Sequence, residues 1–333
     1  MKINKFTSLF ATCLLLGLTA CSNDNVSDAD SGNGAENKDL TGKTSFSITS
    51  EAKTRTSGVY DSGVNFYWTT NDNIWVKSGS TTSPTLTASS SNNITSTTTS
   101  AKFYFDGTYT AASYPVRYTG NASTSGNTVT IATSQNQVEA NNATQLGTVG
   151  DCGVGTATRQ SDGSYKFTLS HKASYITFMP YYSKEALDAS AVVTQIKVEA
   201  ANGEKLAGTF NFSDSGLGDA NSSSNNVTLT LNGTSPTPGF PIPTTATASK
   251  NAAIMVVAPG TYSTFKVTYT LYDSVTGTKS TISYTYSGIN CTAGKNQVIK
   301  TDLGMATYTS RKTNYYMSVS YTHLRAHETV LDL

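Results

Sequence analysis

The sequence predicts an all-β protein whose exported part folds as two β-sandwich domains in tandem. Short segments of alternating apolar and polar residues are separated by turns rich in Gly, Asn and Ser, as in a sandwich. The chain contains 19 Tyr and 26 Gly, which is typical of extracellular β-proteins. Its 333 residues exceed what one sandwich needs, so we expect two domains, at residues 44–160 and 161–318.

Residues 1–20 predict a lipoprotein signal peptide. Lys2 and Lys5 precede the apolar run Leu9–Leu18, which is too short to be a stable membrane anchor. The run ends in Leu18-Thr19-Ala20-Cys21, a small pair followed by the cysteine at which bacterial lipoproteins are cut. We therefore expect lipid on Cys21, and the alternative is an ordinary signal peptide with a chance cysteine.

The next segment, residues 21–43, predicts a flexible lipidated linker. It is acidic and has few apolar residues, so it cannot bury enough surface to fold alone. Acidic residues soon after a lipidated cysteine resemble the signal that sends some lipoproteins to the outer face of the outer membrane. A solvated linker without that signal is the alternative.

The first domain is expected to begin with a strand at Thr44–Ser50, in which Phe46 and Ile48 alternate with Ser and Thr. An exposed loop, Lys53–Gly58, should follow. Trp68 and Trp75 adjoin a polar turn, a position typical of core residues. Weak strands or loops are expected over Ser78–Ser100 and a loop over Gln135–Gly155, with further strands at Ala101–Phe105, Tyr114–Tyr118 and Thr128–Ile131.

The second domain is expected to contain a central strand and a long hairpin. Ile254–Ala258 is apolar on both faces, which predicts a position in the middle of the core. Phe265–Tyr286 alternates on both sides of a turn at Asp273–Thr278, which predicts the hairpin. A short helix is predicted at Ser183–Ala189.

The composition argues against nucleic-acid binding and against enzymatic chemistry. The formal net charge is +1 and 14% of residues are charged, so no basic field favours nucleic acid. No pair of facing carboxylates and no nucleophile with a base is recognisable. His171 is on an apolar strand pattern and is interpreted as a core residue bonded to backbone. We expect no cofactor and no metal.

Two cysteines remain in the body of the chain, Cys152 and Cys291. In an oxidising compartment they could pair, and closing so long a loop would stabilise the fold by roughly 4–5 kcal/mol in the chain-entropy model. Each could equally be a small buried apolar side chain. Sequence leaves both alternatives open.

Several features together resemble the fimbrillin-like surface lipoproteins, the subunits of protease-matured (type V) pili. They are the lipidation motif and acidic linker, the turn at Thr54–Gly58, the run around His171, and the Ala258-Pro259-Gly260 turn before the final hairpin. The resemblance covers about residues 1–318, and the order of the motifs carries it. It implies two transthyretin-like, Greek-key sandwiches and a surface pilus subunit.

The resemblance also implies how such a subunit matures and which partners it has. An arginine-specific protease cuts the loop after the first strand, and Arg55 matches that position. The strand leaves, and an extended segment of another pilin subunit, self or related, fills the groove. The outer membrane, through lipid on Cys21, and host or bacterial surface glycans or proteins are the other expected partners. A glycan-binding surface lipoprotein is the alternative function, favoured if Trp68 or Trp75 lies on an open face.

Residues 319–333 depart from this pattern. The composition is no longer rich in Ser, Thr and Tyr. His323 and His327 are four residues apart, so on a helix their side chains could bind a metal together. The segment resembles a peptide that recurs at the ends of unrelated reading frames through sequencing-adapter read-through. We interpret it as a non-native tail and assign it no metal site.

Overall fold

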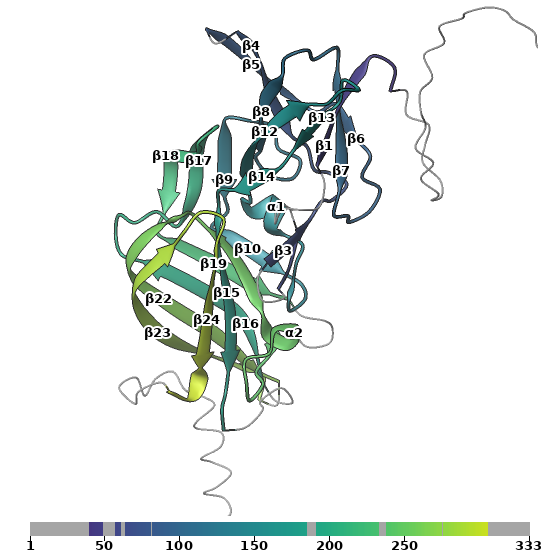
Figure 1. Ribbon diagram of the computed structural model, residues 1–333. Helices are drawn as coiled ribbons and strands as arrows, with labels where there is room; N and C mark the ends of the chain where they lie inside the picture. The colour runs from purple at the N-terminus through teal and green to yellow at the C-terminus, as the bar shows by residue number, and fades with distance from the viewer. Residues whose placement is uncertain are drawn as a thin grey trace, which may run out of the picture. The chain divides into compact units, whose positions relative to one another are not determined.

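The computed structural model describes residues 40–48, 57–60, 64–80, 82–184, 191–232, 238–274 and 276–305, all within the compact unit Asp39–Leu333. Strands dominate these residues (Figure 1). Their helices are two four-residue segments, α1 (Leu146–Val149) and α2 (Ala248–Asn251), and a 3-10 turn, η1 (Leu303–Met305). The predicted all-β sandwich class is confirmed.

The largest sheet has nine strands and contains the first strand of the described chain. Its order is β5-β4-β8-β12-β13-β1-β7-β6, and β14 also pairs with β12. The bounds are β1 (Lys43–Ile48), β4 (Trp75–Ser80), β5 (Ser83–Ala88), β6 (Ser91–Asn92), β7 (Ala101–Asp106), β8 (Ser113–Tyr118), β12 (Gly153–Arg159), β13 (Tyr165–Phe167) and β14 (Leu169–His171).

Four further sheets complete the fold. A six-stranded sheet has the order β10-β19-β16-β22-β23 with β20 beside β16, and three-stranded sheets have the orders β11-β2-β3, β21-β15-β24 and β18-β17-β9. The bounds are β2 (Ser57–Tyr60), β3 (Val64–Tyr67), β9 (Thr128–Ile131), β10 (Ser134–Gln137), β11 (Asn142–Ala143), β15 (Ser174–Tyr181), β16 (Ala191–Ala200), β17 (Ala207–Ser213), β18 (Gly216–Ser224), β19 (Asn226–Leu231), β20 (Phe240–Pro241), β21 (Ala253–Val257), β22 (Gly260–Asp273), β23 (Thr278–Cys291) and β24 (Asn296–Asp302).

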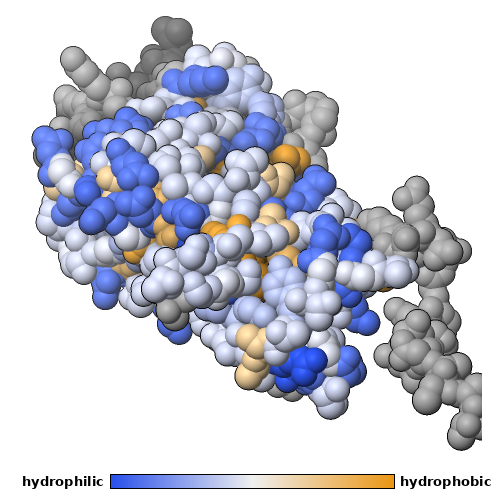
Figure 2. Space-filling model, turned by 90° about the horizontal axis from the view of Figure 1, so that it is seen from above, coloured by the Kyte–Doolittle hydropathy of each residue, from blue (hydrophilic) through white to orange (hydrophobic). Residues whose placement is uncertain are grey.

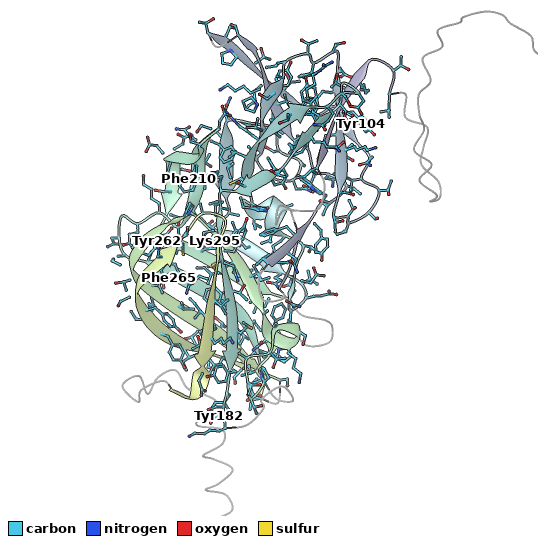
Figure 3. The ribbon with its side chains drawn as sticks, viewed as in Figure 1. Tyr104, Tyr182, Phe210, Tyr262, Phe265 and Lys295 are labelled. Atoms are coloured by element: carbon cyan, nitrogen blue, oxygen red, sulfur yellow. The ribbon has the colours of Figure 1, made fainter. Side chains whose placement is uncertain are left out.

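The buried apolar residues form two cores. One lies on the nine-stranded sheet and is rich in aromatic rings, among them Phe46, Trp68 and Phe103. The other is larger and is built mainly from the six-stranded sheet and from β15 and β21. Figure 3 labels Tyr104 on β7 of the nine-stranded sheet, and Tyr262 and Phe265 on β22 of the six-stranded sheet.

Several predicted elements are confirmed. Every residue of β21 is buried, as the apolar run at 254–258 predicts, and β22 and β23 form the predicted hairpin. Trp68 is fully buried. The predicted loop at Gln135–Gly155 is wrong, because it contains β11, α1 and parts of β10 and β12. Of the helix predicted at Ser183–Ala189, residues 185–189 lie outside the described part of the chain.

Strand pairing connects segments on both sides of residue 160. Strand β1 pairs with β13, while β9 and β10 pair with β17 and β19. Arg117 on β8 makes a further connection, because it hydrogen-bonds Asp214 in the β17–β18 turn. The boundary between domains at 44–160 and 161–318 stays a prediction.

Two buried glutamines on β10 hydrogen-bond the backbone groups along the edge of β21 that has no neighbouring strand. The side-chain amide of Gln135 donates to Val256 O (2.7 Å) and accepts from Val256 N (2.9 Å). Gln137 does the same with Ala252 O (3.0 Å) and Ile254 N (2.7 Å). Because buried backbone groups need partners, these amides take the place of a neighbouring strand.

Replacing Gln137 with Leu tests this role. The variant leaves buried backbone groups of Ala252 and Ile254 unpaired, at about 1–3 kcal/mol for each group. We expect a correspondingly lower free energy of unfolding in urea. Gln297→Leu, at an exposed position on β24, is the control and should change stability by less than about 0.5 kcal/mol. Equal stability of the two variants would contradict the role.

Candidate functional site

Strand β1 is the candidate functional element, because it lies inside a sheet rather than at its edge. It runs parallel to β13, with Phe46 opposite Tyr165 and Ile48 opposite Phe167. On its other side it runs antiparallel to β7, from the pair Lys43 and Asp106 to the pair Ile48 and Ala101. Among the described strands, β7 and β13 are joined only through β1. We call the space between them the β1 slot.

The inward face of β1 carries two apolar side chains. Strand residues alternate between faces, so Phe46 and Ile48 point into the core while Ser45 and Ser47 point away from it. Both apolar side chains are buried. The Phe46 ring stacks on Tyr165 with centroids 4.6 Å apart and planes 9° apart. It also meets the rings of Phe105 at 4.9 Å and Tyr109 at 5.4 Å edge to face. These favourable ring geometries make Phe46 the main anchor of β1.

Polar contacts hold the start of β1. Thr44 Oγ1 donates to the carbonyl oxygen of Gly107 (2.8 Å) and accepts from the backbone N–H of Tyr109 (3.4 Å). Lys43 Nζ forms an ion pair with Asp106 and donates to Ser90 Oγ (3.0 Å). The hydrogen bond from Lys43 lowers the pKa of the exposed Asp106 carboxyl from its ordinary value.

The covalent link between β1 and the rest of the fold also bears on its function. Among the folded elements described, the first to follow β1 along the chain is β2, which begins at Ser57. A break in the intervening residues 49–56 would leave β1 held to the body by noncovalent contacts alone. If β1 left, the facing edges of β7 and β13 would expose unpaired backbone groups and apolar pockets, which are the requirements for strand addition.

The predicted site residues are placed as follows. Cys21 and Arg55 lie outside the described residues. Cys152 and Cys291 are buried and are free thiols in the structure, and their pairing in the exported protein stays a proposal. Burial raises the pKa of Cys152 well above its ordinary value and the pKa of Cys291 to about 11. Both are therefore poor nucleophiles at neutral pH.

His171 belongs to a buried polar cluster that sequence reasoning missed. Its Nδ1 lies 2.8 Å from Asp151 Oδ1 and 3.0 Å from the hydroxyl of Tyr175, which also bonds Asp151. The ring of Phe66 stacks on His171 with centroids 4.1 Å apart. Burial, and then the Asp151 carboxylate, raise the pKa of Tyr175 well above its ordinary value.

The burial of this cluster favours a role in stabilising the fold over a catalytic role. Asp151 and Tyr175 are buried, and 7% of the His171 side chain is exposed. His171 is a core residue, as predicted, although carboxylate and hydroxyl groups bond it where backbone was expected. Among the described residues, no group of three His, Cys, Asp or Glu side chains could hold a metal ion.

The two tryptophans bear on the glycan-binding alternative. Trp68 is fully buried and meets the rings of Phe103 and Tyr118. Trp75 is half-buried, and a Cβ atom at Gly126 would lie 2.8 Å from its ring, so the backbone packs tightly there. The burial of Trp68 counts against a sugar-stacking platform. The surface face in Figure 2 is mostly hydrophilic or neutral, with apolar residues in small groups.

Arg117 connects the nine-stranded sheet to the β17–β18 hairpin. It is buried, and its guanidinium donates to Asp214 Oδ1 (2.7 Å), to Asn127 Oδ1 (2.8 Å) and to the carbonyl of Phe212 (3.0 Å). Lys77 also pairs with Asp214. Partial burial raises the pKa of Asp214, but the hydrogen bonds from Arg117 and Lys77 outweigh it, so the net pKa is lowered.

Phe46→Ala should weaken the fold strongly. A buried Phe replaced by Ala costs about 3–5 kcal/mol, from lost apolar transfer and the cavity left behind. We expect a loss of this size in the free energy of unfolding measured by urea titration. Ser47→Ala, at the neighbouring outward position, should stay within about 0.5 kcal/mol of the parent. Equal effects at both positions would contradict the assignment of Phe46 as the anchor.

Asp214 should make stability depend on acid pH. Because its folded pKa is lowered, its contribution is present above the unfolded value near 4 and is lost as pH falls through the folded value. Asp214→Asn should therefore be less stable than the parent at pH 7, and the difference should shrink below about pH 4. Asp219→Asn, at an exposed position on β18, is the control. An unchanged difference from pH 7 to pH 2 would contradict the ion pair.

None of the described helices has the length and apolar character that a membrane span requires. No protein-family model and no curated protein matches the chain. The fold is similar to a candidate cell adhesion protein from Bacteroides uniformis ATCC 8492, at 14% identity over 78% of this chain and 91% of that one, with TM-score 0.38.

Two other solved structures are similar to this chain at the same level. A candidate cell adhesion protein from Bacteroides fragilis NCTC 9343 is 11% identical over 78% of this chain and 92% of that one, with TM-score 0.35. A fimbrial protein from Bacteroides ovatus ATCC 8483 is 13% identical over 78% of this chain and 49% of that one, with TM-score 0.39.

Proposed function

We propose that this protein is a structural and adhesive subunit of a bacterial surface fimbria, exported as a lipoprotein and assembled by β-strand exchange after proteolysis near Arg55. The observation that carries the proposal is the position of β1. It fills a slot between β7 and β13, and the chain that links it to the rest of the fold passes through Arg55.

The physical basis of assembly is strand addition. Once β1 leaves, the two edges of the slot present backbone donors and acceptors, which an incoming strand can pair on both sides. The pockets vacated by Phe46 and Ile48 favour an incoming strand with apolar residues at every second position. A strand from another subunit, self or related, would restore the sheet and join the two subunits.

Cys21 and β1 lie on the same side of Arg55 in the chain. Cleavage there would separate both from the body in one step. Lipid on Cys21 would hold the precursor at the outer membrane, and the cut would release the body while opening its slot. This order keeps the slot closed until the precursor reaches the cell surface.

The remaining partners follow from the surface location. Host or bacterial glycans or proteins are the targets of adhesion, and the protein works without a cofactor, without nucleic acid and without enzymatic activity. The alternative of a glycan-binding lipoprotein loses support from the burial of Trp68.

Conservative substitution of Arg55 tests the proposal in cells. Arg55→Lys keeps the charge but removes the arginine that an arginine-specific protease requires. We expect the variant to stay in the membrane fraction with Cys21 as its first residue and to form no fibres, while wild-type subunits in fibres begin at Thr56. N-terminal sequencing of purified fibres measures both.

The matched control is Arg159→Lys, at an exposed position on β12, which should assemble as the wild type does. Fibres built from Arg55→Lys subunits that still begin at Cys21 would contradict the proposal.

A further inference from the structure

We infer that the open face of the nine-stranded sheet around Lys102, Tyr104 and Lys166 binds an acidic glycan, a sugar chain that carries carboxylate or sulfate groups. We call these three residues the lysine–tyrosine patch. The inference rests on the proposed function, because it names the class of ligand for the adhesive role. It requires neither cleavage at Arg55 nor the departure of β1.

The strand register places the three side chains on one face of the sheet. Ser47 on β1 stands opposite Lys102 on β7 and Lys166 on β13, and residues directly opposite each other share a face. Phe46, the residue before Ser47, points into the core, so Ser47 and both lysines point away from it. Tyr104 follows Lys102 by two positions on β7 and therefore lies on the same outward face.

This part of the outward face is open, whereas the part beyond it is covered. Trp75 and Arg117 stand opposite each other on the same face of β4 and β8, and Arg117 is buried against the carbonyl of Phe212. On β7 and β13, by contrast, Lys102 and Lys166 are exposed. A ligand can therefore reach the sheet at the lysine–tyrosine patch.

The two lysines are spaced to act together. Two strand spacings separate their Cα atoms, which is about 10 Å. Each ammonium group ends a long flexible side chain, so Lys102 and Lys166 can meet one acidic group between them or two acidic groups along an extended chain.

The neighbouring carboxylates already have partners. Asp106 on β7 is paired with Lys43. Asp162, in the turn between β12 and β13, accepts hydrogen bonds from the backbone N–H and the hydroxyl of Ser164. These bonds, and to a lesser extent the charge of Lys166, lower the pKa of Asp162 from its ordinary value.

The charge of the patch favours an anionic ligand. Neither Lys102 nor Lys166 forms an ion pair with a residue that the structure describes. Two cationic side chains on an otherwise hydroxyl-rich face attract a ligand of opposite charge and favour its association.

Tyr104 adds the feature that suits a sugar rather than a simple anion. Figure 3 labels it on β7, where the side chain is half-buried. Its ring offers an apolar surface for the C–H groups of a sugar, and its hydroxyl can bond a sugar hydroxyl. Burial raises the pKa of Tyr104 from its ordinary value, so the phenol stays neutral beside an acidic ligand. Thr158, exposed on β12 opposite Lys166, supplies a further hydroxyl.

Binding of oligosaccharides to the uncut exported chain tests the inference. Fluorescent oligogalacturonate carries carboxylates, dextran sulfate carries sulfates, and dextran is the neutral blank. We expect at least one acidic probe to bind about tenfold or more tighter than dextran in fluorescence anisotropy. The affinity should fall as the NaCl concentration rises. The two acidic probes distinguish carboxylate from sulfate recognition.

Matched variants assign the binding to the patch. Lys102→Gln with Lys166→Gln should weaken binding of the acidic probe about tenfold or more, while Arg at both positions should preserve it. The control is Lys205→Gln with Lys279→Gln, two exposed lysines elsewhere, which changes the net charge equally and should leave binding nearly unchanged. Tyr104→Leu should weaken binding of the sugar probe but not of inorganic polyphosphate. Urea titration of each variant checks that the fold is kept.

Three results would overturn the inference. They are acidic probes that bind no better than dextran, equal losses in the patch variant and the control variant, and unchanged sugar binding in Tyr104→Leu. Each would leave strand exchange standing, because these measurements use the uncut chain and the Arg55→Lys variant tests assembly separately.

Discussion

The pairing of β1 with strands from two distant parts of the chain is the constraint on which the nine-stranded sheet depends. Phe46 stands opposite Phe103 on one side and Tyr165 on the other, so one residue connects three segments that are far apart in the sequence. Its ring stacks on Tyr165 with centroids 4.6 Å apart, at the point where the sheet would otherwise divide.

A strand in the middle of a sheet is normally the least replaceable part of a fold. Here it is also the first of the described strands, and the segment that follows it contains the proposed cleavage site. Cutting the chain does not change the contacts of β1, but it removes the high local concentration that a covalent link provides. The cut strand would then compete with any other strand that carries apolar residues at every second position. The edge of β21 offers no such place, because glutamine amides from β10 already bond its backbone groups.

The sequence predicts much of this fold and part of the site. Alternation at Phe46 and Ile48 predicts β1, and continuous apolar residues at 254–257 predict the buried strand β21. It does not predict that β1 lies between 101–106 and 165–167, because local patterns do not encode which distant strands pair. Strand β18 (Gly216–Ser224) is missed because most of its residues are small or polar, so it has no alternating apolar signal. Gln135, Gln137 and Asp151 are missed because polar side chains are expected at the surface, and only tertiary partners explain their burial.

The most direct measurement is a high-resolution structure of the assembled fibre, in which the strand between β7 and β13 can be traced to its chain of origin. Strand exchange predicts that this strand comes from a neighbouring subunit and that residues 43–48 are absent from the slot. Residues 43–48 of the same chain in that position, continuous through Arg55, would contradict it.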